Sequence, residues 1–376
     1  MKTALCVKKD SCYTFITELR NYLNLCTISE VSKNILSSRE ELYKKETNED
    51  EKKLIKNQIE SFNKFIEYNK SLIEKYNEKT QDFYMISRDI CEIPSNGYIQ
   101  FIPYLVIFTY DPSNPLNLKI LHYLRSTKGN ENRLHNKTSC GIGGHIDKED
   151  LYVDGEVYLT IPGFVKICIN SAKRELKEEL DIDATEIGGL ELNDLYFGVI
   201  PNATAEESDE VDTVHAGLII YKYVDYYKFD YLISKANEYV KNIDQYKNDV
   251  DESLSAHEIK EVGTMNVKLE EFFSMFLIKS YIDAFYGQNF WKDIVEKSVC
   301  NDNPNNQQEN VDKAYIMGFK GFIGINKNDY EDMSKTRFMY DMFDKFFNDC
   351  NLENWSRIAV YMLASMAVVN SIISQR

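Results

Sequence analysis

One helix-length segment lies among strand-like segments, and this alternation constrains the fold more than any other feature. Between residues 162 and 180, apolar residues recur every three or four positions, as they do along one side of an α-helix. Before and after it, the chain carries short runs rich in β-branched and aromatic residues, which are typical of β-strands. The alternation predicts an α+β domain. The predicted strands are residues 98–110, 118–126, 138–147, 194–202, 211–224 and 258–267.

The pattern of helix-forming and strand-forming residues changes twice along the chain, which suggests three regions. A chain of 376 residues with 43% hydrophobic residues can form one large domain or two to three smaller ones. Residues 1–93 are predicted to be helical, and residues 94–275 form the strand-rich domain. Residues 276–376 are predicted to form a helical C-terminal region, in which residues 351–376 could pack back on the strand-rich domain.

A stripe of apolar residues runs through the first region between Thr47 and Lys79. Its members follow alternating steps of four and three, which is the repeat of an amphipathic or coiled-coil helix. Either this stripe packs on its own chain, or it joins two copies of the chain in a homodimer. The stripe consists of Ile55, Ile59, Phe62, Ile66, Ile73 and Tyr76, with Asn69 at the one polar position.

Charge and cysteine usage narrow the classes of function. The net charge is −16, so the chain lacks the overall basic character of nucleic-acid-binding proteins, and no nucleic-acid partner is expected. Eight cysteines occur without a CxxC pair, which suggests reduced thiols in an intracellular, cytoplasmic protein. The apolar run at residues 358–374 contains several polar residues, and a buried helix is favoured there over a membrane anchor.

Three glutamates gather in the segment RELKEEL at residues 174–180. Glu175, Glu178 and Glu179 lie three and four positions apart, where like charges repel on a helix surface. The cluster is either a solvated acidic face or a site for Mg²⁺ or Mn²⁺, because hard divalent cations prefer oxygen ligands. Arg174 lies four positions before Glu178 and is expected to hold its carboxylate in place.

This acidic helix, preceded by a glycine pair, resembles the signature of the Nudix hydrolase family. The family pattern is R-E-hydrophobic-x-E-E-x-G-hydrophobic, and residues 174–182, RELKEELDI, match it at eight of nine positions. Asp181 replaces the family's glycine, and aspartate tolerates the left-handed conformation that a helix end often needs. Thr160 and Lys166 stand where the family has a glycine and a glutamate further upstream.

The glycine pair also extends the resemblance. Gly143 and Gly144 lie in GIGGHID, where a missing Cβ lets the backbone come close to another group. The pair is further from the acidic helix than is usual, which implies an insertion at residues 148–161. With PYLVIF, VHAGLII and LENWSRI, these strings resemble a group of bacterial and phage Nudix proteins over roughly residues 98–271 and 351–366.

The resemblance implies a fold, an activity and a site. The expected fold is an α/β/α Nudix sandwich around a mixed sheet, with helical N-terminal and C-terminal additions. The implied activity is metal-dependent hydrolysis of the diphosphate bond in a nucleoside diphosphate linked to another group. Mg²⁺ or Mn²⁺ would be held by Glu175, Glu178 and Glu179, where it would activate a water and neutralise developing charge. The expected catalytic residues are Glu175, Glu178 and Arg174.

Other residues are candidates for the site, but each of them also has an ordinary structural interpretation. A general base could be one of the three glutamates or a later carboxylate. His215 lies inside an apolar strand, where packing is favoured over substrate contact. The substrate-binding candidates are Gly143, Gly144, His145, Arg125 and Arg133, with Lys128 beside the two arginines. The candidate later carboxylates are Glu258 and Glu261, and the acidic loop at residues 206–212 is a further possibility.

Two other functions remain open beside hydrolysis of a small-molecule nucleotide. The substitutions at Thr160, Lys166 and Asp181 fit a nucleotide-binding or sensing module that is catalytically weak. An RNA-cap-directed hydrolase is the third hypothesis, and the net charge of −16 disfavours it because phosphate contacts dominate RNA affinity.

Overall fold

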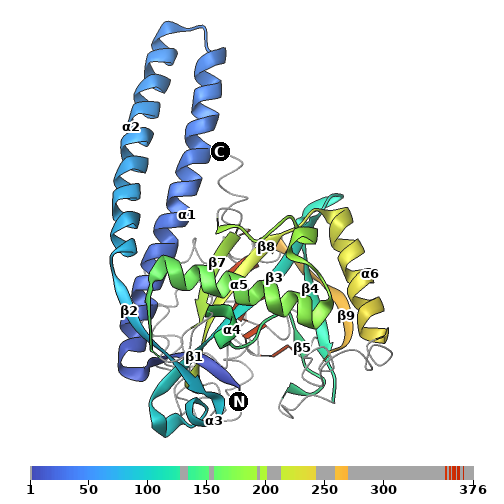
Figure 1. The fold of residues 1–376 in the computed structure, drawn as a ribbon. Coiled ribbons are helices and arrows are strands. Elements are labelled where there is room, and N and C mark those ends of the chain that lie inside the picture. Colours follow the sequence, from blue (N-terminus) through green and yellow to red (C-terminus); the bar gives the residue numbers. More distant parts are fainter. Residues whose placement is uncertain are drawn as a thin grey trace, which may run out of the picture. The chain divides into compact units, whose positions relative to one another are not determined.

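The computed structural model describes residues 2–127, 134–151, 156–192, 195–200, 213–242 and 259–269, and parts of 352–367. The chain forms two compact units, whose helices and strands are labelled in Figure 1. Unit 1 comprises Met1–Leu105, Gly143–Lys177 and Asp183–Lys222. Unit 2 comprises Val106–Ile142, Glu178–Ile182 and Tyr223–Arg376.

Unit 1 contains antiparallel ladders built from distant parts of the sequence. Its strands are β1 (Thr3–Lys8), β2 (Thr80–Ser87), the first part of β3 (Tyr98–Asp111), β6 (Glu156–Thr160), β7 (Leu195–Ile200) and most of β8 (His215–Tyr223). β1 lies between β3 and β2, and Cys6 is opposite Gln100 on one side and Tyr84 on the other. β6 pairs with the far edge of β2, and β7 pairs with β8. The N-terminal strand therefore lies inside the sheet.

Two long helices at the start of the chain form an antiparallel hairpin in unit 1 (Figure 1). The chain turns between them at Asn48, whose side chain caps the second helix by accepting hydrogen bonds from the backbone N–H groups of Asp50 and Glu51. The helical elements of unit 1 are α1 (Lys9–Lys45), α2 (Glu49–Glu74), η1 (Lys75–Asn77), α3 (Arg88–Cys91), η2 (Pro94–Asn96), α4 (Lys148–Leu151), α5 (Ile161–Leu180, in unit 1 up to Lys177) and η4 (Ala184–Ile187).

Four phenylalanines form the aromatic core of unit 1. Phe15 of α1, Phe83 of β2, Phe101 of β3 and Phe164 of α5 are fully buried. Phe15 meets the other three rings edge-on at centroid distances of 5.0–5.2 Å, and Phe83 stacks on Phe164 at 5.2 Å. Such geometries add to the stability gained by burying the rings. The first helix and the acidic helix thus share one core.

Unit 2 is centred on β4, which has strands on both of its edges. Its elements are the second part of β3, β4 (Asn114–Arg125), β5 (Thr138–Ser139), β9 (Ile259–Lys268) and the helix α6 (Tyr226–Asn242). β3 and β4 form a hairpin, while β9 runs antiparallel along most of β4. α6 lies on β9, where the Asn237 side chain accepts a hydrogen bond from Val262 N at 2.9 Å.

The C-terminal part of unit 2 contacts the strands that lead to the glycine pair. Leu352 forms a parallel bridge with Thr138, and Glu353 N donates to Thr138 O at 3.0 Å. Cys140 N donates to Ser356 Oγ at 2.7 Å. The described residues between 355 and 367 are helical and largely buried, as predicted for this apolar run.

The predicted α+β class is confirmed, and most predicted elements of the strand-rich region are present. The helix predicted at residues 162–180 is α5, and its predicted apolar stripe is buried. Strands predicted at 98–110, 118–126, 194–202, 211–224 and 258–267 correspond to β3, β4, β7, β8 and β9. The strand predicted at 138–147 is shorter, because only Thr138 and Ser139 pair with β4.

Two structural predictions are wrong. Residues 1–93 are not helical throughout, because residues 3–8 and 80–87 form β1 and β2. These strands pair with each other across two intervening helices, which local periodicity cannot reveal. The segment 148–161, interpreted as an inserted loop, contains α4 and the strand β6, which pairs with β2.

The stripe at residues 47–79 packs on its own chain, since α2 lies against α1 and both Ile55 and Asn69 are buried. Among the described residues, no helix is both long and apolar enough to span a bilayer. The expected helical region at 276–345 lies outside the described residues, and the expected domain boundaries stay predictions.

Candidate active site

The glycine pair and the acidic helix meet within unit 1. A Cβ on Gly144 would lie 2.3 Å from Oε1 and 2.7 Å from Cδ of Glu175, so the Glu175 carboxylate packs directly on the Gly144 backbone. A Cβ on Gly143 would lie 2.0 Å from the carbonyl oxygen of Pro103 in β3. Both separations are shorter than real contacts allow, so a side chain at Gly143 would collide with backbone, whereas one at Gly144 would displace the Glu175 carboxylate.

Arg174 is held by several groups of unit 1. Its Nε and Nη2 donate to the two carboxylate oxygens of Asp150 at 2.9 and 3.0 Å, a bidentate arrangement. Nη2 also donates to the backbone oxygen of His145 at 3.0 Å, and Nη1 donates to Glu175 Oε1 at 2.9 Å. Arg174 therefore ties the glycine loop, α4 and the acidic helix together and orients Glu175. The expected contact with Glu178 stays a prediction.

Asp150 is a site residue that sequence reasoning missed. It lies in the segment that was interpreted as an insertion, and its side chain is only 5% exposed. Its carboxylate also accepts a hydrogen bond from Asp147 N at 2.9 Å, and Asp147 is paired with Arg88 at 3.4 Å. The acidic run DKED at residues 147–150 is the signal that could have indicated a partner for Arg174.

Two of the three glutamates are buried, which argues against a simple solvated acidic face. Glu175 is 6% exposed and Glu179 is 5% exposed, while Glu178 is half-buried. Burying a carboxylate is costly unless ion pairs, hydrogen bonds or a metal compensate. The continuous helix α5 places the three at successive turns, as expected. It ends at Leu180, and Asp181 has φ of 54°, which is the left-handed conformation that aspartate tolerates at a helix end.

Two histidines of unit 1 are in contact, and one of them directly follows the glycine pair. His145 follows the glycine pair, His215 begins β8, and their Nε2 atoms are 3.4 Å apart. Burial holds the pKa of His145 well below 6.5, and the charges of Arg88, His215, Lys2 and Arg174 lower it further. His145 is therefore a neutral imidazole at pH 7, and one ring can donate a hydrogen bond to the other.

In unit 2, Arg125 is engaged by the C-terminal segment. Its Nε donates to Glu353 Oε2 at 3.2 Å, and Ser139 Oγ donates to Glu353 Oε1 at 2.6 Å. The guanidinium also lies 5.4 Å from the centroid of the Tyr123 ring. Burial raises the pKa of Tyr123, with Glu179 and Glu353 adding to the rise, so the phenol stays protonated and donates to Gly141 O at 3.2 Å. Arg125 is held in place here by protein groups.

The remaining residues that the sequence singled out lie on separate elements or outside the described residues. Glu261 is exposed on β9 near His122, whose pKa is lowered by burial and raised in part by Glu261. Lys166 is exposed on α5, and Thr160 Oγ1 accepts a hydrogen bond from Gly163 N at 3.2 Å at the start of the helix. Arg133, Lys128, Glu258 and the acidic loop at 206–212 lie outside the described residues.

The carboxylates of α5 are donors of the type that a hard cation binds, but the described structure does not gather them into a metal site. Carboxylate oxygens are the ligands that Mg²⁺ and Mn²⁺ prefer, and α5 supplies three of them on adjacent turns. In the part of the chain that the structure describes, no three His, Cys, Asp or Glu side chains are gathered tightly enough to form a metal site. Glu175 instead lies on Arg174.

Comparisons with known proteins show a similarity to a bacterial protein but give no family assignment. The chain is similar to Protein YmaB of Bacillus subtilis (strain 168), with 30% identity over 120 residues. This region covers 32% of the chain and 47% of YmaB, so the match spans about half of that relative. No protein-family profile matches the chain. No solved structure matches it either.

Proposed function

We propose that the chain is a metal-dependent pyrophosphohydrolase of the Nudix type, with an α/β/α sandwich built around the sheet and α5. It would cleave the diphosphate bond in a nucleoside diphosphate linked to another group. The observation that carries this proposal is the packing of Glu175 on Gly144. Two motifs separated by thirty residues in the sequence, a glycine pair and an acidic helix, lie in contact.

The residues have distinct roles in this proposal. Glu175, Glu178 and Glu179 would hold Mg²⁺ or Mn²⁺, which supplies charge neutralisation and a more acidic water. Arg174 is a positioning residue, because its contacts with Asp150 and the His145 carbonyl fix it where it orients Glu175. The missing Cβ atoms of Gly143 and Gly144 leave space that the Pro103 carbonyl and the Glu175 carboxylate occupy, so in this proposal the glycine pair positions Glu175.

The general base would be one of the glutamates of α5 or a later carboxylate. Glu261 is the later candidate that the structure describes, and Glu258 lies outside the described residues. His145 can accept a hydrogen bond from water or a phosphate hydroxyl, since its low pKa keeps it neutral. None of these assignments requires Arg125, which is already engaged by Glu353.

The test is cleavage of a panel of nucleotides with Mg²⁺ or Mn²⁺, with released nucleotide followed by chromatography. The panel holds NAD, ADP-ribose, dinucleoside polyphosphates, nucleotide sugars, oxidised deoxynucleoside triphosphates and capped RNA. Glu178→Gln is expected to lower kcat at least 100-fold, because it removes a charged ligand. Lys177→Gln is the matched control, since Lys177 is the exposed neighbour on the same helix and should keep full activity.

Three outcomes would decide among the hypotheses. Cleavage that collapses in Glu178→Gln supports the hydrolase and identifies its substrate class. An absence of cleavage together with a nucleotide-induced rise in melting temperature supports the binding module instead. Cleavage restricted to capped RNA, with binding that weakens as salt rises, supports the RNA-directed enzyme.

A further inference from the structure

α2 carries a second row of side chains beside the row that packs on α1. Its members are spaced by steps of four and three, which is the repeat of a coiled-coil seam. Leu54, Phe65 and Tyr68 in this row are 59%, 43% and 61% exposed. Single exposed apolar residues are common, but an exposed row at heptad spacing marks an interaction surface. This row, the outer stripe, consists of Leu54, Gln58, Ser61, Phe65, Tyr68 and Leu72.

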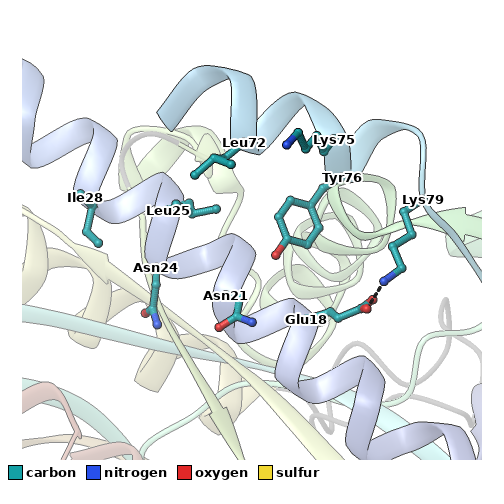
Figure 2. Close-up of a pocket in the computed structure, with 9 residues that line it drawn as sticks. All are labelled: Glu18, Asn21, Asn24, Leu25, Ile28, Leu72, Lys75, Tyr76 and Lys79. Carbon is teal, nitrogen blue, oxygen red and sulfur yellow. Dashed lines mark hydrogen bonds and ion pairs between the residues drawn. The ribbon is translucent and has the colours of Figure 1, made fainter. Parts of the chain in front are cut away.

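α1 presents apolar residues on the same side of the hairpin. Ile28, Ile35 and Leu42 recur every seven positions, and Ile28 and Leu42 are 44% and 42% exposed. A groove of about 570 Å³ runs between the two helices, and Figure 2 shows Ile28 from α1 and Leu72 from α2 lining it. Because Leu72 belongs to the outer stripe, the two exposed rows border the same groove.

The outer stripe is self-complementary when it is reversed. Its steps of four, three, four, three and four read the same in both directions, with residue 63 at the centre. A second α2 placed antiparallel therefore brings Leu54 opposite Leu72 and Ser61 opposite Phe65. The small Ser61 then faces the large Phe65, which lets the two helices approach closely near the centre of the stripe. A two-fold axis produces this kind of symmetric contact.

The charges of the hairpin also permit association of two copies. Residues 9–74 hold eleven Lys or Arg and twelve Asp or Glu, so the hairpin is almost neutral in a chain of net charge −16. Most of the repulsion between two copies thus resides elsewhere in the chain. The same reversal about residue 63 places Lys52 opposite Glu74, a pair of opposite charge.

We propose that the outer stripe and the exposed row of α1 dock a second copy of this chain, and that the two hairpins form an antiparallel four-helix contact. Each copy contributes five exposed apolar side chains, and each of them would lose about 100 Å² of accessible surface, an order-of-magnitude figure for half-exposed large side chains. The two copies together therefore bury on the order of 1,000 Å². That area is the size at which a specific interface becomes stable. The row containing Ile55 is not part of this interface, since it packs on α1.

The first test is the mass of the full chain in solution by light scattering and sedimentation at several concentrations. The wild type is expected at twice 43.9 kDa. The double variant Phe65→Glu/Tyr68→Glu and the single variant Leu54→Glu are expected to be monomers, with unchanged circular dichroism because these positions are exposed. Tyr231→Glu is the matched control, since this 56% exposed tyrosine lies on α6, and it should remain a dimer.

The second test addresses the antiparallel register. Lys52→Glu should weaken self-association several-fold, and Lys52→Glu/Glu74→Lys should restore it, because each copy then supplies both reversed charges. A wild type that stays at 43.9 kDa at all concentrations overturns the proposal. So does a dimer that survives Phe65→Glu/Tyr68→Glu, because it must use another face. Both results are independent of nucleotide cleavage.

Discussion

Replacing Gly144 by alanine tests whether the position of Glu175 matters. The new Cβ would lie 2.3 Å from Glu175 Oε1, whereas ordinary contacts begin near 3.4 Å, so the carboxylate must move by about 1 Å. The obstructing atoms are the end of a flexible side chain, and an off-rotamer adjustment costs on the order of 1 kcal/mol. The folded state should therefore survive, with a small decrease in melting temperature.

The site should suffer more than the fold. A displacement of about 1 Å at a catalytic group can cost on the order of 100-fold in rate. Gly144→Ala is thus expected to weaken Mn²⁺ binding at least tenfold by calorimetry and to lower kcat by about 100-fold, while urea unfolding shifts by about 1 kcal/mol. Moving Glu175 also disturbs its 2.9 Å hydrogen bond from Arg174 Nη1.

Two other glycines provide the comparison. A Cβ on Gly143 would lie 2.0 Å from a backbone oxygen of Pro103, which cannot rotate away, so Gly143→Ala should cost about 3 kcal/mol or more in stability. A Cβ on Gly163 meets only Thr160 Oγ1 at 3.2 Å, and Gly163→Ala in α5 should be neutral or slightly stabilising.

Normal Mn²⁺ binding and activity in Gly144→Ala would refute the assignment of Glu175 to the site.

Three further predictions concern buried groups that can ionise. Asp150→Ala removes the bidentate partner of Arg174 and should lower the free energy of unfolding by about 3 kcal/mol, measured in urea. Glu353→Ala leaves Ser139 Oγ without this acceptor and should cost a similar amount; an unchanged midpoint in either variant would contradict the burial argument. His145 has a pKa below 6.5 in the folded chain, so the unfolded chain takes up the proton first as the pH falls. The free energy of unfolding that is present above pH 6.5 is therefore lost below it, by up to about 1.4 kcal/mol per pH unit. His145→Asn should flatten the unfolding free energy between pH 7 and 5, and an equal slope in both proteins would refute this.

The strands and helix that the sequence predicted correctly are those with a strong local signal. α5 carries an uninterrupted apolar stripe, and β3 is a long run of β-branched and aromatic residues, so periodicity alone locates both. The left-handed conformation at Asp181 agrees with the sequence argument, because many helices end in this conformation and aspartate tolerates it. α6, in contrast, was missed although its apolar residues Phe229, Leu232, Ala236 and Val240 are buried on one side.

The errors concern pairings between distant segments. β1 has only six residues and directly precedes a 37-residue helix, so its short apolar run merged with the helical pattern. Its identity as a strand depends on β2, more than seventy residues later. β6 was hidden for the same reason, because its partner is also β2. Short strands are defined by their neighbours more than by their own residues.

At the candidate site, too, the sequence predicted contacts between near neighbours in the chain but not contacts between distant residues. The spacing of Glu175, Glu178 and Glu179 on one helix was readable because a helix fixes the geometry between neighbours. The partner of Arg174 was not readable, since Asp150 lies 24 residues earlier and reaches it only through the folded chain. A segment that the sequence marks as an insertion can therefore still supply a residue that holds a side chain of the candidate site in place. In this chain the segment 148–161 supplies both a strand to the sheet and the carboxylate that fixes Arg174, so deleting it should remove the site together with the fold of unit 1.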